Sequence, residues 1–126
     1  MLRLTGLVLA ALLCLPIPSQ GSSELIRPVQ GEQGSVHVIA VDRLPAEARD
    51  TLRAIKQGGP FAFPRDGAVF NNFERDLPEH QRGYYHEYTV ITPGMNNRGV
   101  RRIVTGEDGE YYYTADHYQT FNRILE

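Results

Sequence analysis

The residues with the clearest chemical potential lie in two segments of the second half of the chain. Glu87 belongs to the apolar and aromatic run 84–91, while Arg98 and Arg102 lie before and inside the run 100–105. A carboxylate beside two guanidinium groups suits a phosphodiester, because the cations bind the non-bridging oxygens and the carboxylate accepts a proton from a hydroxyl. The same pattern also fits an ordinary cross-strand ion pair.

The two runs are β-type segments joined by a turn-rich stretch, which predicts an antiparallel hairpin. In the register that we expect, Glu87 lies opposite Arg102. Side chains alternate across a strand, so Arg98 and Arg102 share a face with Glu87, and Arg101 points to the other face. A slip of one residue would separate these groups.

A general acid would complete such a site, and histidine suits this task because its unperturbed pKa is near neutrality. The four histidines are His37, His80, His86 and His117. His86 neighbours Glu87 on the predicted strand and therefore points to the opposite face. His117 follows the last predicted strand and is free to approach the site from a loop. By itself, it also fits a surface or hydrogen-bonded histidine.

Composition excludes several classes of function. The chain has 13 basic and 15 acidic side chains, and Arg3 is the only charged residue before Glu24. Without Arg3, 12 basic side chains remain against 15 acidic ones, a net charge of −3 that excludes a polycation held to nucleic acid by bulk charge. The histidines lack metal-ligand spacing, and the single cysteine is Cys14. We therefore expect no metal and no cofactor.

The N-terminal segment has the pattern of a secretory signal peptide. Arg3 precedes the apolar run 4–15, and prolines and small residues follow it. A run of about a dozen residues is too short to span a bilayer. The sequence predicts a signal peptide over 1–21, a flexible leader over 22–34 and one domain over 35–126. This interpretation implies a secreted protein that has no membrane association after the signal peptide is cleaved. The alternative is that this segment is a permanent membrane anchor or a buried helix.

The rest of the chain predicts an α+β fold. Ala48, Leu52 and Ile55 form an apolar face within 44–56, and Gly58 follows, which indicates a helix. The remaining apolar runs are short and separated by turn residues. We expect one N-terminal helix packed on an antiparallel sheet of about five strands. The predicted strands are 36–41, 68–70, 84–91, 100–105 and 111–114.

Several segments, in order, resemble the microbial guanyl-specific ribonucleases, closest to the ribonuclease Sa-like branch and more distantly to the barnase-like branch. They are the stretch that begins at 44–48 and ends at 66–70, and the segments 84–94, 98–103 and 112–118. The resemblance extends from about Val36 to Phe121. It implies the microbial ribonuclease fold. It also implies a secreted endoribonuclease that cleaves single-stranded RNA 3′ of guanosine through a 2′,3′-cyclic phosphate.

Roles follow from the resemblance position by position. Glu87 matches the general base that takes the 2′-hydroxyl proton, and His117 matches the general acid that protonates the departing 5′ oxygen. Arg98 and Arg102 match the phosphate-binding arginines, and Tyr118 matches a tyrosine that contacts phosphate. The substrate is RNA because DNA lacks the attacking 2′-hydroxyl.

The resemblance places the guanine site in the loop that begins at Phe70. Glu74 corresponds to the acceptor for the ring N–H and amino group of guanine, and Phe70 to a ring that stacks on the base. Backbone N–H groups around Asn71, Asn72 and Phe73 correspond to donors for the carbonyl oxygen of the base. Where the Sa-like branch has an arginine and a glutamine, this chain has Phe73 and Asn71. Because backbone N–H groups would bind the base, these side-chain changes are compatible with guanine recognition.

The resemblance also implies partners. A barstar-like intracellular inhibitor is expected because leaked ribonuclease harms the cell that makes it, and an acidic inhibitor would use the cationic phosphate site. The enzyme is expected to be a monomer.

Two other functions stay open, namely a non-catalytic RNA-binding or inhibitor-binding relative of the same fold, and a toxin ribonuclease delivered into competing cells. The filled catalytic positions argue against the first, and the simple signal peptide argues against the second.

Overall fold

The structure is a computed structural model that describes residues 36–126. The predicted signal peptide (1–21) and leader (22–34) lie outside the described residues, as does the predicted start of the domain at residue 35. Within 36–126, no helix has both the length and the apolar character needed to cross a membrane.

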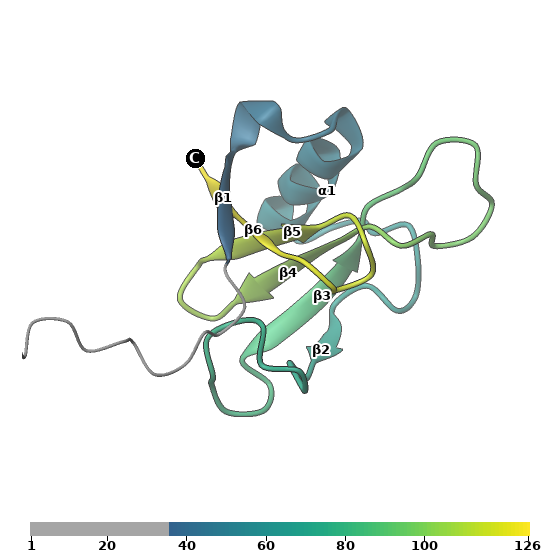
Figure 1. Ribbon diagram of the computed structural model, residues 1–126. Coiled ribbons are helices and arrows are strands. Elements are labelled where there is room, and N and C mark those ends of the chain that lie inside the picture. Colours follow the sequence, from purple (N-terminus) through teal and green to yellow (C-terminus); the bar gives the residue numbers. More distant parts are fainter. Residues whose placement is uncertain (1–35) are drawn as a thin grey trace, which may run out of the picture. The chain divides into compact units, whose positions relative to one another are not determined.

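One α-helix and one six-stranded sheet make up the described part of the chain (Figure 1). The spatial order of the strands is β1-β6-β5-β4-β3-β2; β1 pairs with β6 in parallel and every other pair is antiparallel. The predicted α+β fold is confirmed. The bounds are β1 His37–Ala40, α1 Ala46–Gln57, β2 Ala68–Phe70, β3 Tyr85–Thr89, β4 Arg102–Gly106, β5 Tyr111–Thr114 and β6 Asn122–Leu125, with a short 3₁₀ turn at Val41–Arg43.

The helix α1 forms where the sequence predicts it. Ala48 and Leu52 are buried at 0% and 3% exposure, and Ile55 packs beside them against the sheet. Gly58 ends the helix with φ of 81°, in the left-handed region that glycine adopts without a steric penalty. The apolar face of the helix therefore fixes one side of the domain.

The two faces of the sheet have separate cores. Residues of α1 pack on one face with the cluster Leu44, Ala48, Leu52, Val90, Ile103, Tyr113 and Ile124. On the other face, loops cover the cluster Leu77, Tyr85, Val104, Tyr112 and Phe121. Glu87 lies directly opposite Val104 in the β3–β4 pair, so its side chain belongs to the face away from the helix. The candidate site is on that loop-covered face.

The predicted register of the β3–β4 hairpin is wrong by two residues. Glu87 lies opposite Val104, and Arg102 lies opposite Thr89. Two residues are one full period of strand alternation, so Glu87 and Arg102 still share a face. The predicted grouping of these two side chains therefore holds although their direct pairing does not.

The register differs because the connection between the strands is longer than predicted. The last backbone bond joins the N–H of Val90 to the carbonyl of Arg101 at 3.0 Å, and the chain between them forms an open loop. Arg98 lies in that loop rather than on a strand. Arg101 points to the helix side as predicted, with Nη1 3.8 Å from Oε2 of Glu47.

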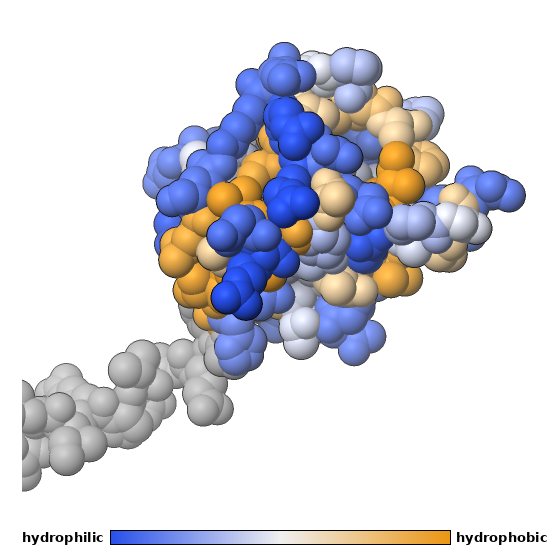
Figure 2. All heavy atoms as spheres, turned by 90° about the horizontal axis from the view of Figure 1, so that it is seen from above, coloured by the Kyte–Doolittle hydropathy of each residue, from blue (hydrophilic) through white to orange (hydrophobic). Residues whose placement is uncertain are grey.

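The surface mixes polar and apolar residues. The face in Figure 2 shows hydrophilic side chains (blue) interspersed with smaller hydrophobic areas (orange). The most exposed large apolar side chain of the described residues is Phe73, at 86% exposure. A phenyl ring left this far in water is unusual for packing alone, and it lies in the predicted guanine loop.

Candidate active site

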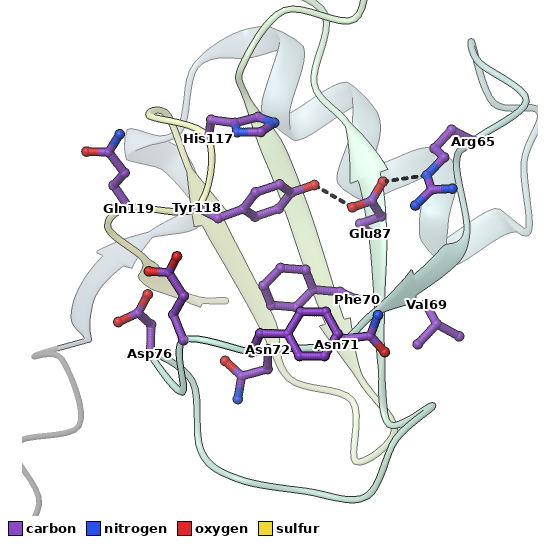
Figure 3. A pocket seen from close by; sticks show the side chains of 12 residues that line it. Arg65, Val69, Phe70, Asn71, Asn72, Asp76, Glu87, His117, Tyr118 and Gln119 are labelled. Carbon is purple, nitrogen blue, oxygen red and sulfur yellow. Dashed lines mark hydrogen bonds and ion pairs between the residues drawn. The ribbon is translucent and has the colours of Figure 1, made fainter.

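A cavity of about 360 Å³ opens on the loop-covered face, next to β2 and β3 (Figure 3). It brings together eight of the ten site residues predicted from the sequence. These are Phe70, Asn71, Asn72, Phe73, Glu74, Glu87, His117 and Tyr118. Arg98 and Arg102 do not line the cavity, but both contact residues that do.

The Glu87 carboxylate forms the centre of the site. Its side chain is 9% exposed, and each oxygen has its own partners. Oε1 accepts a hydrogen bond from Nη2 of Arg98 at 3.1 Å and lies 3.5 Å from Nε of Arg65. Oε2 accepts a hydrogen bond from the Tyr118 hydroxyl at 2.5 Å. These partners hold the carboxylate in a fixed orientation.

Tyr118 connects the parts of the site. Its ring stacks on Phe70 with centroids 4.9 Å apart, and it lies 4.9 Å from the His117 ring. The Cζ atom of Arg102 lies 6.0 Å from the centroid of the Tyr118 ring. Burial, and then the hydrogen bond to Glu87, raise the pKa of the Tyr118 hydroxyl. The phenol therefore stays a hydrogen-bond donor at neutral pH.

Arg98 is fixed from several directions. Its Nε donates to the Thr89 hydroxyl at 2.9 Å, and its Nη2 lies 3.1 Å from Glu87 and 3.9 Å from Oδ1 of Asp66. Asp66 in turn accepts hydrogen bonds from both the N–H and the hydroxyl of Thr89 at 2.7 Å. This network explains how a loop arginine reaches the carboxylate without belonging to a strand.

Arg102 is a buried cation without a carboxylate partner among residues 36–126. It is 3% exposed, and Nη1 donates to the carbonyls of Arg98, Gly99 and Arg101 at 2.9 to 3.3 Å. Its Nε has no hydrogen-bond partner in the described part of the chain. A buried guanidinium is costly unless an anion compensates it. Its environment therefore favours binding of an anion such as phosphate.

His117 reaches the cavity from the loop after β5, as predicted. His117 and Tyr118 have φ angles of 55° and 71°, in the left-handed region that residues other than glycine rarely adopt. Asp116 stabilises this turn by accepting hydrogen bonds from Thr114 and from residues 119–120, while the N–H of His117 donates to the carbonyl of Val100 at 3.0 Å. Such strain persists where the surroundings enforce it, and functional sites are the usual place.

The predicted guanine loop is closed by one side chain. The amide of Asn72 donates to the carbonyl of Leu77 at 2.8 Å and accepts from the N–H of Leu77 at 3.1 Å. Within 36–126, the N–H groups of Phe73 and Glu74 donate to no backbone carbonyl. The loop thus presents free donors beside the exposed Glu74 carboxylate, an arrangement that suits a base with a carbonyl and adjacent N–H groups.

Four of the cavity residues were not predicted from the sequence. They are Arg65, Val69, Asp76 and Gln119. Arg65 and Asp66 belong to the turn before β2, which the sequence marks only as a break between strands. An Arg-Asp-Gly turn has no periodicity that reveals which side chain points inward, so the sequence pattern does not indicate the contacts of Arg65 and Asp66.

Within residues 36–126, no three His, Cys, Asp or Glu side chains lie close enough together to hold a metal ion.

Comparison with known proteins identifies the family. The sequence model of the ribonuclease family matches residues 27–125. Guanyl-specific ribonuclease Sa3 of Kitasatospora aureofaciens is 56% identical over 87 residues, which is 68% of this chain and 62% of that protein's length. Guanyl-specific ribonuclease St of Saccharopolyspora erythraea is 50% identical over 95 residues, 75% of this chain and 94% of the relative.

A solved structure agrees in fold as well as in sequence. Ribonuclease Sa2, studied in complexes with mononucleotides, superposes with a TM-score of 0.72 at 49% identity and covers 73% of this chain and 96% of its own. The same ribonuclease has been solved with guanosine-2′-cyclophosphate. The match of the family over most of the chain and the identity to these relatives, which are named guanyl-specific, show that the chain belongs to the ribonuclease family.

Proposed function

We propose that this chain cleaves single-stranded RNA on the 3′ side of guanosine through a 2′,3′-cyclic phosphate. The observation that carries the proposal is the cavity that joins the oriented Glu87 carboxylate to the exposed imidazole of His117, with Tyr118 between them. A cyclic guanosine phosphate bound to ribonuclease Sa2 supports the intermediate by analogy. General acid and base catalysis requires two such groups on opposite sides of the reacting phosphate.

In the first step, Glu87 accepts the proton of the guanosine 2′-hydroxyl while the 2′ oxygen attacks phosphorus. The bond from phosphorus to the 5′ oxygen of the next nucleotide breaks, and protonated His117 gives its proton to that oxygen. A 2′,3′-cyclic phosphate and a free 5′-hydroxyl result. Side-chain acid and base groups each contribute about 10²–10⁴-fold to such steps.

In the second step, the two groups exchange roles. Neutral His117 accepts a proton from a water molecule as the water oxygen attacks phosphorus, and protonated Glu87 gives its proton to the departing 2′ oxygen. The product is a 3′-phosphate, and both side chains return to their starting states. The exposure of His117 gives water access to the face where attack occurs.

Negative charge that grows on the phosphate oxygens needs fixed donors. Arg102, buried and without a carboxylate partner among the described residues, supplies one cation. Arg98 and the protonated Tyr118 hydroxyl supply further donors beside Glu87. Donors that are already oriented stabilise a transition state without reorganisation, which is the largest single contribution in many enzymes.

Guanine is read by the loop that Asn72 closes. The Glu74 carboxylate accepts from the ring N–H and the amino group, a donor pair that adenine lacks. The N–H groups of Asn71, Asn72 and Phe73 donate to the base carbonyl, and Phe70, fixed by its stacking on Tyr118, offers a ring for the base. The relatives named guanyl-specific support this assignment.

The biological setting follows from the sequence pattern. The predicted signal peptide supports secretion into the medium, and a monomer suits a site built from one chain. A barstar-like inhibitor inside the producing cell would bind the same cationic site with acidic side chains. A pull-down with a purified barstar-like protein tests this partner directly.

The test of the proposed activity is cleavage of single-stranded RNA by the purified protein with a chelator present. We expect fragments that end in guanosine 2′,3′-cyclic phosphate and, later, in guanosine 3′-phosphate. Intact RNA would instead support the alternative of a non-catalytic relative that only binds RNA or an inhibitor.

A further inference from the structure

Arg65 is a third arginine at the central carboxylate, and it has no part in the proposed proton transfers. Its side chain is 65% exposed, yet its Nε lies 3.5 Å from Oε1 of Glu87. Figure 3 shows Arg65 reaching Glu87 from the side opposite Tyr118. Arg65 also lines the cavity. It therefore combines contact with the reacting group and freedom to move.

The other two arginines lack that freedom. Arg102 is 3% exposed and its Nη1 is bound to three backbone carbonyls. Arg98 is bound to Thr89, Glu87 and Asp66. Neither can follow a substrate beyond the central phosphate. Arg65 has one ion-pair partner among the described residues, and water screens this pair on the exposed arginine side, so the contact is weak enough to be exchanged.

The two oxygens of Glu87 separate the site into two sides. Oε2 faces Tyr118, and the His117 ring lies 4.9 Å from the Tyr118 ring. Oε1 faces Arg65. In the proposed reaction the departing 3′ nucleotide leaves toward His117. A strand that leaves the site toward His117 would enter it from the other side of Glu87, where Arg65 is the exposed cation.

We propose that Arg65 binds the phosphate 5′ of the guanosine and gives up its contact with Glu87 when RNA enters. The proposal rests on the proposed function, since it uses the same strand direction. Oε1 of Glu87 then keeps Arg98 and gains the 2′-hydroxyl. The planar guanidinium of Arg65 moves from one oxyanion to another, and arginine suits this exchange because its fork matches both carboxylate and phosphate.

The experiment compares two minimal substrates, the dinucleotide GpU and the same molecule with a 5′-phosphate, pGpU. We expect the native protein to cleave pGpU about fivefold more efficiently than GpU, as kcat/KM, because one exposed charge-assisted contact has about this strength. The advantage should appear in KM, since binding away from the reacting atoms is the same in the ground and transition states. Cleavage of GpU by itself tests the proposed function, whereas the ratio tests Arg65.

The variants are Arg65→Gln, Arg65→Lys and the matched control Arg53→Gln. Arg53 is also an exposed arginine, at 64% exposure, paired with a carboxylate at 3.0 Å, but it lies on α1 outside the cavity. We expect Arg65→Gln to abolish the preference for pGpU, Arg65→Lys to keep part of it and Arg53→Gln to keep it fully. Equal losses on both substrates in Arg65→Gln, or an unchanged ratio, would overturn the proposal.

Discussion

The Tyr118 hydroxyl donates a 2.5 Å hydrogen bond to Oε2 of the Glu87 carboxylate. This contact joins β3 to the loop that carries His117, because Tyr118 comes 31 residues after Glu87 in the chain. It fixes the orientation of the carboxylate, and it places a phenol between the proposed base and acid. Because burial and this hydrogen bond raise the pKa of Tyr118, the hydroxyl remains a donor at neutral pH.

Removing that hydroxyl should impair the reaction without unfolding the protein. We expect Tyr118→Phe to lower kcat/KM for GpU about tenfold or more, because a donor to both Glu87 and the phosphate is lost while the ring still stacks on Phe70. Tyr84→Phe is the matched control. Tyr84 donates a 2.5 Å hydrogen bond to Glu110, outside the cavity, and its loss should leave kcat/KM unchanged. Equal activities of the two variants would refute a role for the Tyr118 hydroxyl.

The roles proposed for Glu87 and His117 predict a larger loss of activity. Glu87→Gln and His117→Gln should each lower kcat for RNA cleavage by about 10²–10⁴-fold, since each removes one proton-transfer group. Stopped assays with GpU at saturating substrate measure this effect, and circular dichroism checks the fold. Near-native turnover by both variants would contradict the mechanism.

Asp66 is expected to matter for stability. Its side chain is 3% exposed and accepts hydrogen bonds from the N–H and hydroxyl of Thr89 and from the N–H of Phe63. Asp66→Ala leaves buried donors unpaired, so we expect a loss of about 3 kcal/mol in the free energy of unfolding by urea.

Asp50→Ala is the matched control for this prediction. The Asp50 side chain is 69% exposed and pairs only with Arg53 among the described residues, so its removal should cost well under about 1 kcal/mol. A loss in Asp66→Ala as small as in Asp50→Ala would show that the Asp66 network does not support the fold.

The helix and the grouping of the main site residues could be predicted from the sequence. The helix was predictable because Ala48, Leu52 and Ile55 repeat with helical spacing and Gly58 ends it. Glu87 and Arg102 were placed on one face correctly, although the register was off by two residues, because strand alternation repeats every two residues. The family resemblance supplied the roles that periodicity left open.

Other features had no local signature. The strand β6 was missed, since Asn122–Leu125 is four residues long and its β1 partner is at the other end of the domain. Arg65 was missed because its contact with Glu87 depends on a turn, and neither residue type nor spacing reveals where a turn directs an arginine. Long-range pairing and loop conformation thus set the limit of what the sequence predicted.

Acid should loosen the loop that presents His117. Burial by itself would raise the pKa of the Asp116 carboxyl, but hydrogen bonds from Thr120, Thr114 and Gln119 outweigh it and lower the pKa. The unfolded chain therefore binds this proton at higher pH than the folded protein, so the stabilisation is complete above about pH 4 and disappears as pH falls through the lowered value. We expect Asp116→Asn to lose less stability than the native protein between about pH 5 and pH 2. Urea denaturation across this range gives the comparison, and identical pH slopes would contradict it.

This site is proposed to cleave RNA after guanosine. The most direct measurement is kcat/KM for the dinucleotides GpU and ApU with the purified protein under one set of conditions. We expect GpU to be cleaved about 10²-fold or more faster than ApU, because adenine lacks the donor pair that Glu74 accepts and leaves this carboxylate and the loop N–H groups without partners. Equal rates for GpU and ApU, or no cleavage of either, would contradict it.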